Sequence, residues 1–323
     1  MTYAERPTAL YYSMLQYQPE SLAALKLAFD VIVLETPKDD TPEILKQVHV
    51  LFAPLGFMVD KSKIDACPNL KVVASNTTGH PHIDVSYCRD KNIGVACLKF
   101  AQGFLDTITP TAELAFGMII AVTRGILRAH HSALSGVWDR RPFGAPAMLS
   151  RMKLGVVGLG RLGAKVAAMA RSTGMQIRYY DPNVTSALYS SADSLHELAK
   201  WSDVLSIHVP HENETEGMIS RDVLSALPRG GYLINTSRGE LVDWRALQDL
   251  LESGHLAGAG IDVFEGEFDQ DFQKKYLQHP FLEFARNHGN VLITPHIGGS
   301  TVDAWRETEL QTIRMAEAHF RSD

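Results

Sequence analysis

Short apolar runs alternate with helical stretches along the first hundred residues. The runs VIVLE, HVLFAP and LKVVASN predict buried strands, and SLAALKLAF predicts a helix. Strands without polar alternation, separated by helices, are typical of a parallel sheet whose two faces are covered. The pattern therefore predicts a small α/β domain that ends near Phe100.

The segment 109–138 predicts one long helix after this domain. Thr109 suits an N-cap, Pro110 the first helical position, and Glu113 the first turn. Apolar residues then recur over several turns, and Gly136 is the expected end. A helix of this length can connect two α/β units.

A second α/β unit follows this helix. The strand KLGVV leads into a glycine-rich turn and the alanine-rich helix AKVAAMAR. Further buried strands are predicted at QIRYYD, DVLSIHV, YLINTS, AGAGIDV and NVLITP. The last segment, TVDAWRETELQTIRMAEAHF, has helical spacing, and we expect it to return to the first domain.

Composition agrees with two ordinary globular domains. The 323 residues are 45% hydrophobic and 21% charged, and a single core rarely grows to this size. The formal charge of −6, with no basic block, gives no electrostatic support for a nucleic-acid or membrane partner. The three cysteines have no metal-like spacing, so we expect no metal site and buried thiols in a reducing compartment.

Neither a secretory leader nor a membrane span is expected. The N-terminus has no positively charged region followed by a long apolar run. The longest apolar stretch, ELAFGMIIAV, is too short for a bilayer and carries Glu113. We therefore expect a soluble cytoplasmic protein.

The turn GVVGLGRLG carries a G-x-G-x-x-G pattern between a strand and a helix. Gly158 permits the tight turn, Gly160 lets a pyrophosphate approach the backbone, and Gly163 lets the helix pack on the strand. The turn, with Arg161 and Leu162, leads into the helix N-terminus, whose free N–H groups can bind the phosphates. This context predicts a dinucleotide site.

Asp181 ends the next strand, QIRYYD, where an acid can accept both ribose hydroxyls of the adenosine. A carboxylate there repels a 2′-phosphate, so NAD is favoured over NADP. Arg178 lies three residues earlier and should face the other side of the strand.

Three residues have the chemistry that hydride transfer to a 2-keto acid requires. Arg238 can hold a carboxylate in bidentate fashion, and His296 can supply a proton near neutral pH. Glu267 can favour the imidazolium and fix its tautomer. Each follows a predicted parallel strand, at the edge where open α/β sheets bind ligands. Taken singly, each could instead be a surface or turn residue.

The chain resembles the D-isomer-specific 2-hydroxyacid dehydrogenase family from about Thr109 to Gly299. The matching segments are TPTAELAFGMIIAVTR, GVVGLGRLG, SDVLSIHVP, LINTSRGELVD, AGAGIDVFEGE and TPHIGGST. The resemblance implies two Rossmann-like, doubly wound parallel-sheet domains with the active site in the cleft between them. It implies a flavodoxin-like substrate domain, 1–100 plus 297–323, and an NAD-binding domain, 101–296, whose linker helix forms a homodimer.

The resemblance also implies site residues. Arg238 would bind substrate, His296 would be the acid/base, and Glu267 would support it. The backbone amides at Thr78 and Gly79 would meet the substrate carboxylate. The positions implied to lie near the cofactor, besides the glycine turn and Asp181, are Thr111, His208, Pro210, Thr236, Asp262 and Gly298.

Several positions depart from the family pattern. Phe268 stands where proline usually follows the glutamate, and the insertion FDQDFQKKYLQHPFLEFARNHGN delays the last strand. Glu265 therefore remains a rival to Glu267. In the substrate loop TTGHPHID, His80 and His82 could contact an anionic substrate or could be surface residues. Phosphate recognition lacks its usual arginine, although Lys61 and Lys63 lie nearby.

The sequence thus predicts an NAD-dependent dehydrogenase for a small 2-hydroxy or 2-keto acid. Two alternatives stay open. One is a non-catalytic NAD(H)-sensing scaffold of the same fold, which the lack of tails or linkers for partners disfavours. The other is a dehydrogenase for an unusual donor such as phosphite. The sequence does not identify the substrate or the physiological direction.

Overall fold

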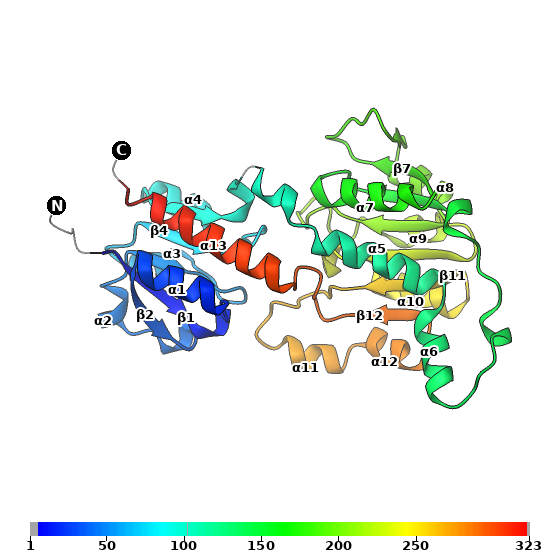
Figure 1. Ribbon diagram of the computed structural model, residues 1–323, viewed down its shortest axis with the longest axis horizontal. Helices are drawn as coiled ribbons and strands as arrows, with labels where there is room; N and C mark the ends of the chain where they lie inside the picture. The colour runs from blue at the N-terminus through cyan, green and yellow to red at the C-terminus, as the bar shows by residue number, and fades with distance from the viewer. Residues whose placement is uncertain (1–5, 102, 322–323) are drawn as a thin grey trace. The chain divides into compact units, whose positions relative to one another are not determined.

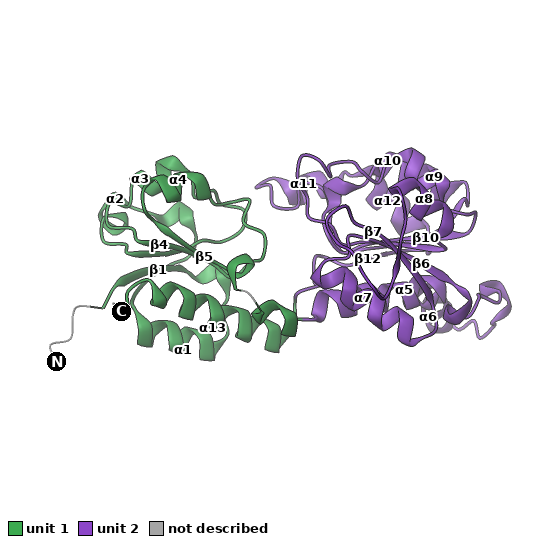
Figure 2. Ribbon diagram, turned by 90° about the horizontal axis from the view of Figure 1, so that it is seen from above, with its two compact units in different colours: residues 1–108, 300–323 green, residues 109–299 purple. Residues whose placement is uncertain are grey.

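The computed structural model describes residues 6–101 and 103–321, and the chain divides into two compact units. Unit 1 comprises residues 1–108 and 300–323, and unit 2 comprises residues 109–299 (Figure 2). Both divisions fall a few residues after the boundaries expected from the sequence. Each unit is an α/β fold with an entirely parallel sheet, which confirms the predicted fold class.

Unit 1 is built on a five-stranded sheet in the order β2-β1-β3-β4-β5, the flavodoxin-like arrangement. Its strands are β1 (Thr8–Tyr12), β2 (Asp30–Leu34), β3 (Val50–Phe52), β4 (Val72–Ser75) and β5 (Gly94–Cys97). Strands β1 and β5 were not predicted. Strand β1 lies inside the sheet between β2 and β3, and its short run, TALYY, contains a single branched aliphatic residue, unlike the apolar runs that were predicted as buried strands.

Helices cover both faces of this sheet. The helices are α1 (Pro19–Ala28), α2 (Pro42–Leu45), α3 (Lys61–Asp65), α4 (Val85–Asp90) and the C-terminal α13 (Val302–Ala318). Ala9 and Tyr11 of β1 point into the core beneath α1 and α13, and Leu10 and Tyr12 into the core on the other face. Helix α13 packs against α1, β4 and β5 (Figure 1), so the last segment belongs to unit 1.

Unit 2 contains a seven-stranded sheet in the order β12-β11-β10-β9-β6-β7-β8, a Rossmann arrangement extended by one strand. Its strands are β6 (Lys153–Val157), β7 (Gln176–Tyr180), β8 (Ser190–Ser191), β9 (Val204–Ile207), β10 (Gly231–Asn235), β11 (Leu256–Ile261) and β12 (Val291–Ile293). The strand order reverses between β6 and β9, and this switch point is where such sheets bind ligands.

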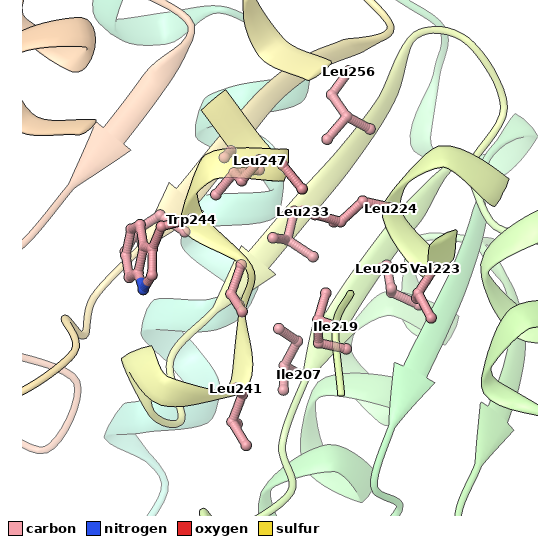
Figure 3. Close-up of a cluster of buried hydrophobic side chains, with 14 of the residues drawn as sticks. Leu205, Ile207, Ile219, Val223, Leu224, Leu233, Leu241, Trp244, Leu247 and Leu256 are labelled. Carbon is pink, nitrogen blue, oxygen red and sulfur yellow. The ribbon is translucent and has the colours of Figure 1, made fainter. Parts of the chain in front are cut away.

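Two hydrophobic layers enclose the unit 2 sheet. One lies beneath α5 (Pro110–Thr123) and α7 (Arg161–Ser172). The other lies beneath α8 (Leu195–Trp201), α9 (Arg221–Ala226), α10 (Trp244–Glu252) and α12 (Pro280–Asn287). In this second layer Leu233 of β10 lies among Leu224, Leu247 and their neighbours (Figure 3). The insertion after Glu267 folds as α11 (Phe272–Leu277) and α12, and α12 adds Phe281 and Phe284 to this layer.

The prediction of a single linker helix over 109–138 is wrong, because the segment forms two helices. Helix α5 ends at Thr123, and α6 (Ile126–Leu134) begins after Gly125. Gly125 has φ of 61°, a left-handed conformation that ends a helix and favours glycine. Gly136, the expected end, does follow α6 and also has a positive φ of 82°.

The apolar stretch before this break lies in a longer segment, Phe104–Thr123, that could cross a membrane by length and composition alone. The core helix of a globular protein passes the same test. Here α5 packs against α7 and against strands β10, β11 and β12. The segment is therefore weak evidence for a membrane span.

Candidate active site

Apart from Thr111, which lies in the first turn of α5, the predicted site residues of unit 2 follow strands at the carboxyl edge of its sheet. The glycine turn follows β6, Asp181 follows β7, His208 and Pro210 follow β9, Thr236 and Arg238 follow β10, Asp262 and Glu267 follow β11, and His296 and Gly298 follow β12. Because the strands are parallel, their carboxyl ends meet at one edge. The fold thus gathers residues that are up to 140 positions apart in the chain.

The glycine turn has the backbone geometry that a dinucleotide requires. Gly158 has φ of 86°, and a Cβ atom at Gly163 would lie 2.0 Å from the carbonyl oxygen of Gly158. A Cβ at Gly160 would meet nothing within 4 Å, so the backbone there is open to close approach. Helix α7 begins immediately afterwards, at Arg161 and Leu162, and its first N–H groups favour an anion.

Asp181 is tied to this turn. Its Oδ2 accepts a hydrogen bond from the backbone N–H of Leu159 at 2.8 Å, and its Oδ1 accepts one from Asn183 at 2.9 Å. Two bonds leave further lone pairs on both oxygens for the hydroxyls of a ribose. Arg178 is directed elsewhere, with its guanidinium carbon 4.8 Å from the centre of the Trp201 ring.

Polar groups after β9 and β10 can contact the rest of a dinucleotide. Thr236 is buried, and its hydroxyl has no hydrogen-bond partner in the part of the chain that the structure describes. His208 Nε2 lies 2.8 Å from Ser206 Oγ, and burial lowers the pKa of this imidazole to about 4, so it is neutral at physiological pH. Pro210 is exposed next to it.

The turn after β12 packs directly on the first turn of α5. A Cβ atom at Gly298 would lie 3.2 Å from Thr111 Cγ2 and 2.8 Å from Asp262 Oδ2, so only glycine fits without displacing a neighbour.

Four features of this edge together meet the needs of a nicotinamide dinucleotide. They are the open backbone at Gly160, the N-terminus of α7, the carboxylate of Asp181 and the unpartnered hydroxyl of Thr236.

His296 and Glu267 form a close pair. His296 Nδ1 lies 2.8 Å from Glu267 Oε2, with the glutamate side chain 9% exposed and the histidine 35% exposed. The rival Glu265 instead lies 3.1 Å from His279 Nε2, in the insertion. The geometry therefore favours Glu267 as the partner of His296 and leaves its Nε2 available for a substrate.

Arg238 is held by the loop that precedes it. Its Nη1 donates to the carbonyl of Ser237 at 2.6 Å, and Asn235 Nδ2 donates to the carbonyl of Arg238 at 2.8 Å. A Cβ atom at Gly239 would lie 2.1 Å from the backbone nitrogen of Glu265. The loops after β10 and β11 thus touch, which brings Arg238 close to the segment that carries Glu267.

Asp262 organises the turn that presents His296. Its Oδ1 accepts from Thr294 Oγ1 at 2.5 Å and from the N–H of Ile297 at 2.9 Å, and its Oδ2 accepts from the N–H of Gly298 at 2.8 Å. His296 itself has φ of 51°, a strained value for a residue with a side chain. The buried carboxylate stabilises this conformation and so fixes the direction of the imidazole.

The predicted substrate loop lies in unit 1, after β4. Thr77 Oγ1 donates to the carbonyl of Gly79 at 2.6 Å, and Cys97 Sγ donates to the carbonyl of Thr77 at 2.9 Å. Thr78 is exposed at the tip of the loop. These contacts set the backbone of the loop, whose amides were expected to meet a carboxylate.

The two histidines of this loop differ. His82 is 3% exposed, and its Nε2 lies 3.3 Å from Ser75 Oγ. Burial lowers the pKa of His82 to about 4, so this side chain is a neutral part of the core and not a surface cation for an anionic substrate. His80 is partly exposed beside Phe100, and burial followed by the charge of Lys99 lowers its pKa.

Phe268 was noted in the sequence only as a departure from the family pattern, yet its ring lies beside both reactive side chains. The ring centre lies 5.7 Å from that of His296 and 5.9 Å from the guanidinium carbon of Arg238. An unusual residue immediately after Glu267 was the signal that could have identified it.

Profiles of known families match both parts of the chain. Residues 116–298 match "D-isomer specific 2-hydroxyacid dehydrogenase, NAD binding domain", and residues 9–135 match the catalytic domain of the same family. Together these two matches cover most of both compact units.

Individual proteins give the same result. The chain is 35% identical to a glyoxylate reductase of Thermofilum pendens, over 93% of this chain and 86% of that protein. It is similar in structure to a D-lactate dehydrogenase of Aquifex aeolicus crystallised with NAD and lactic acid, with a TM-score of 0.82, 29% identity, and coverage of 96% and 94%. It is also similar to an NADPH-dependent glyoxylate/hydroxypyruvate reductase of Sinorhizobium meliloti, with a TM-score of 0.78, 27% identity, and coverage of 96% and 92%.

Proposed function

We propose that this chain, which belongs to the D-isomer specific 2-hydroxyacid dehydrogenase family, interconverts a small 2-keto acid and its D-2-hydroxy acid by means of Arg238, His296 and Glu267. Membership makes the chain an NAD-dependent dehydrogenase acting on CH–OH donors. The pair of His296 and Glu267, 2.8 Å apart at the carboxyl edge of the sheet, is the observation that supports this assignment of residues best.

The three side chains have distinct roles in this proposal. Arg238 binds the substrate carboxylate and polarises the keto oxygen with its fixed cationic fork. His296 donates a proton from Nε2 to the keto oxygen as charge develops there. Glu267 contacts Nδ1 of His296 and so keeps the imidazole in place before and after the proton is transferred. A bound nicotinamide cofactor supplies or accepts the hydride. Backbone amides at Thr78 and Gly79 add donors for the carboxylate.

The cofactor in this proposal is NAD rather than NADP. Asp181 ends β7 with a carboxylate that suits ribose hydroxyls and repels a 2′-phosphate. Steady-state kinetics with NADH and NADPH test this, and we expect a higher kcat/KM with NADH. A preference for NADPH would contradict the assignment of Asp181.

A panel of substrates tests the reaction itself. Purified protein with NADH would be given glyoxylate, pyruvate, hydroxypyruvate and larger 2-keto acids, and oxidation would be followed at the nicotinamide absorbance. We expect turnover of at least one keto acid, and its loss in the Arg238→Ala variant. NADH binding without turnover would favour a sensing scaffold, and NAD reduction by phosphite alone would favour the other alternative.

We also propose that a second copy of the chain covers the segment 126–148. Helix α6 has no buried residue, and Trp138 is 94% exposed. Further large apolar residues exposed on this segment are Ile126, Leu127, Leu134, Val137 and Met148. Large apolar side chains that are exposed together on one short segment fit a surface that a second copy would cover. Light scattering should report a homodimer, and the Trp138→Glu variant should dissociate; a monomeric wild-type protein would contradict this.

The proposed location is the cytoplasm, where a reducing medium suits the three buried free thiols. Cell fractionation tests this location, and activity confined to a membrane or secreted fraction would contradict it.

A further inference from the structure

Glu267 and Phe268 are the two central residues of one tight turn. The N–H of Asp269 donates to the carbonyl of Gly266 at 2.9 Å, which closes a four-residue turn around them. Gly266 enters the turn with φ of 65°, and its own N–H donates to Glu240 Oε1 at 3.0 Å. The turn that brings the carboxylate to His296 thus also fixes where the phenyl ring goes.

The phenyl ring contacts both groups on which the proposed chemistry depends. The guanidinium carbon of Arg238 lies over the face of the ring, 5.9 Å from its centre. The imidazole of His296 lies at 5.7 Å with the ring planes inclined by 53°. A cation over an aromatic face is attracted by the ring quadrupole, and a tilted pair of rings is also favourable. One side chain therefore restrains two reactive groups.

The segments on either side of this turn are anchored to the core of unit 2. The Trp244 ring stacks on Phe264 with centres 4.3 Å apart and meets the edge of Phe281 at 5.0 Å. His279, also in the insertion, lies 3.1 Å from Glu265. Aromatic packing before and after the turn thus limits how far Phe268 can move.

We propose that Phe268 is a positioning residue of this enzyme, whose ring holds the guanidinium of Arg238 in the orientation that binds the substrate carboxylate beside His296. This inference rests on the proposed roles of Arg238 and His296. The effect belongs to binding more than to chemistry, because Arg238 holds the carboxylate in the substrate and in the transition state alike, and only its contact with the keto oxygen strengthens as charge develops. The ring acts through its quadrupole, so its shape alone is not sufficient.

The Phe268→Ala, Phe268→Leu and Phe268→Tyr variants test this proposal. For Ala we expect KM for the best keto acid to rise about 3- to 10-fold, a range typical of a lost cation–π contact, and kcat to fall by a smaller factor. Tyr should restore the wild-type KM because it keeps the ring face, and Leu should not. Phe272→Ala is the matched control, since that ring contacts Phe264 and Tyr276 in the same insertion.

Binding of oxamate, a non-reducible analogue of a 2-keto acid, gives a readout without turnover. Titration of oxamate into the enzyme saturated with NADH should show the same order of affinity, with wild type equal to Tyr and above Leu and Ala. In an Arg238→Ala background, Phe268→Ala should have no further effect on oxamate, because the ring acts through the arginine. The dissociation constant for NADH should be unchanged in every Phe268 variant, which verifies that the variants fold.

Two results would overturn the inference. One is an Ala variant within 2-fold of wild type in both KM and oxamate affinity, and the other is a Leu variant that binds as tightly as Tyr. If instead the wild-type protein neither reduces any keto acid nor binds oxamate, the proposed function itself fails, and this outcome is distinct from a failure at Phe268.

Discussion

The two regions expected to meet the substrate are stabilised in different ways. In unit 2, the turn that carries His296 is held by a buried carboxylate, Asp262, and His296 itself pairs with a second carboxylate, Glu267. In unit 1, the loop that carries Thr78 and Gly79 is held by neutral groups, a thiol, hydroxyls and an uncharged histidine. Hydrogen bonds to ionised groups are roughly twice as strong as neutral ones.

This difference agrees with the separate roles proposed for the two regions, proton transfer in unit 2 and recognition of the substrate carboxylate in unit 1. Proton transfer tolerates little misplacement, so the imidazole is best fixed by strong bonds from a rigid sheet edge. A loop that recognises a carboxylate through backbone amides can be held by weaker contacts, and its side chains can vary without loss of the fold. The loop in unit 1 is also one of the places where the sequence departs from the family pattern.

The largest expected effect is on stability, from Asp262→Ala. Three donors in the β12 turn would lose their acceptor, and we expect a loss of about 3 to 5 kcal/mol in the free energy of unfolding. Urea unfolding measures it. Asp193→Ala, at an exposed aspartate of the same unit, should change stability by about 0.5 kcal/mol or less. Equal losses in the two variants would contradict a special role for Asp262.

The second effect is on catalysis, from His296→Ala. We expect kcat to fall by a factor of about 10² or more, because the general acid is lost, while NADH affinity is retained. This corresponds to about 2.7 kcal/mol of barrier. His196→Ala, at an exposed histidine on α8, is the matched control. Turnover near that of wild type in His296→Ala would refute the assignment.

The third effect is a pH dependence from unit 1. The pKa of His82 is lowered by burial to about 4 in the folded chain, against about 6.5 in the unfolded chain. Below pH 6.5 His82 therefore binds a proton in the unfolded chain but not in the folded chain. The free energy of unfolding consequently falls as the pH falls towards 4. Between pH 7 and pH 5 this costs about 2 kcal/mol.

Urea unfolding of the wild type and of His82→Gln at both pH values isolates this term from other titrating groups. The variant should lose about 2 kcal/mol less than the wild type on acidification. An identical loss in both proteins would show that His82 titrates normally.

The smallest effect is expected at the neutral contacts of the unit 1 loop. Cys97→Ala removes one weak donor to the carbonyl of Thr77, and we expect a loss of about 1 kcal/mol in stability with kcat unchanged. A drop in kcat as large as that of His296→Ala would end the distinction between the two regions. Differential scanning calorimetry and steady-state rates together decide it.

Local patterns were sufficient where one segment contains its own signal. The strand β6 was predicted with its observed bounds, since KLGVV is followed by the glycine turn that ends it. The linker helix was predicted as one piece because a single glycine, Gly125, does not by sequence alone reveal a left-handed φ. Strand β1 was missed because its run, TALYY, contains a single branched aliphatic residue and so lacks the continuous aliphatic pattern by which buried strands are recognised.

The candidate site shows the same limit. The residue types at Arg238, Glu267 and His296, and their places after strands, were evident from the sequence, because a parallel sheet brings strand ends to one edge. The choice between Glu265 and Glu267 was not evident from the sequence. The two residues are only two positions apart, and the sequence does not show which of their carboxylates reaches His296, which follows the next strand. Only packing decided it, by pairing Glu265 with His279 of the insertion.

The sequence by itself therefore determined the fold class, the family and the chemical groups at the sheet edge, since these depend on local periodicity and on motifs a few residues long. The tertiary structure decided which side chains touch. The pairing of His296 with Glu267, the burial of His82 and the position of Phe268 against Arg238 depend on distances between segments remote in the chain. No local pattern encodes such distances, because they are set by how whole layers pack.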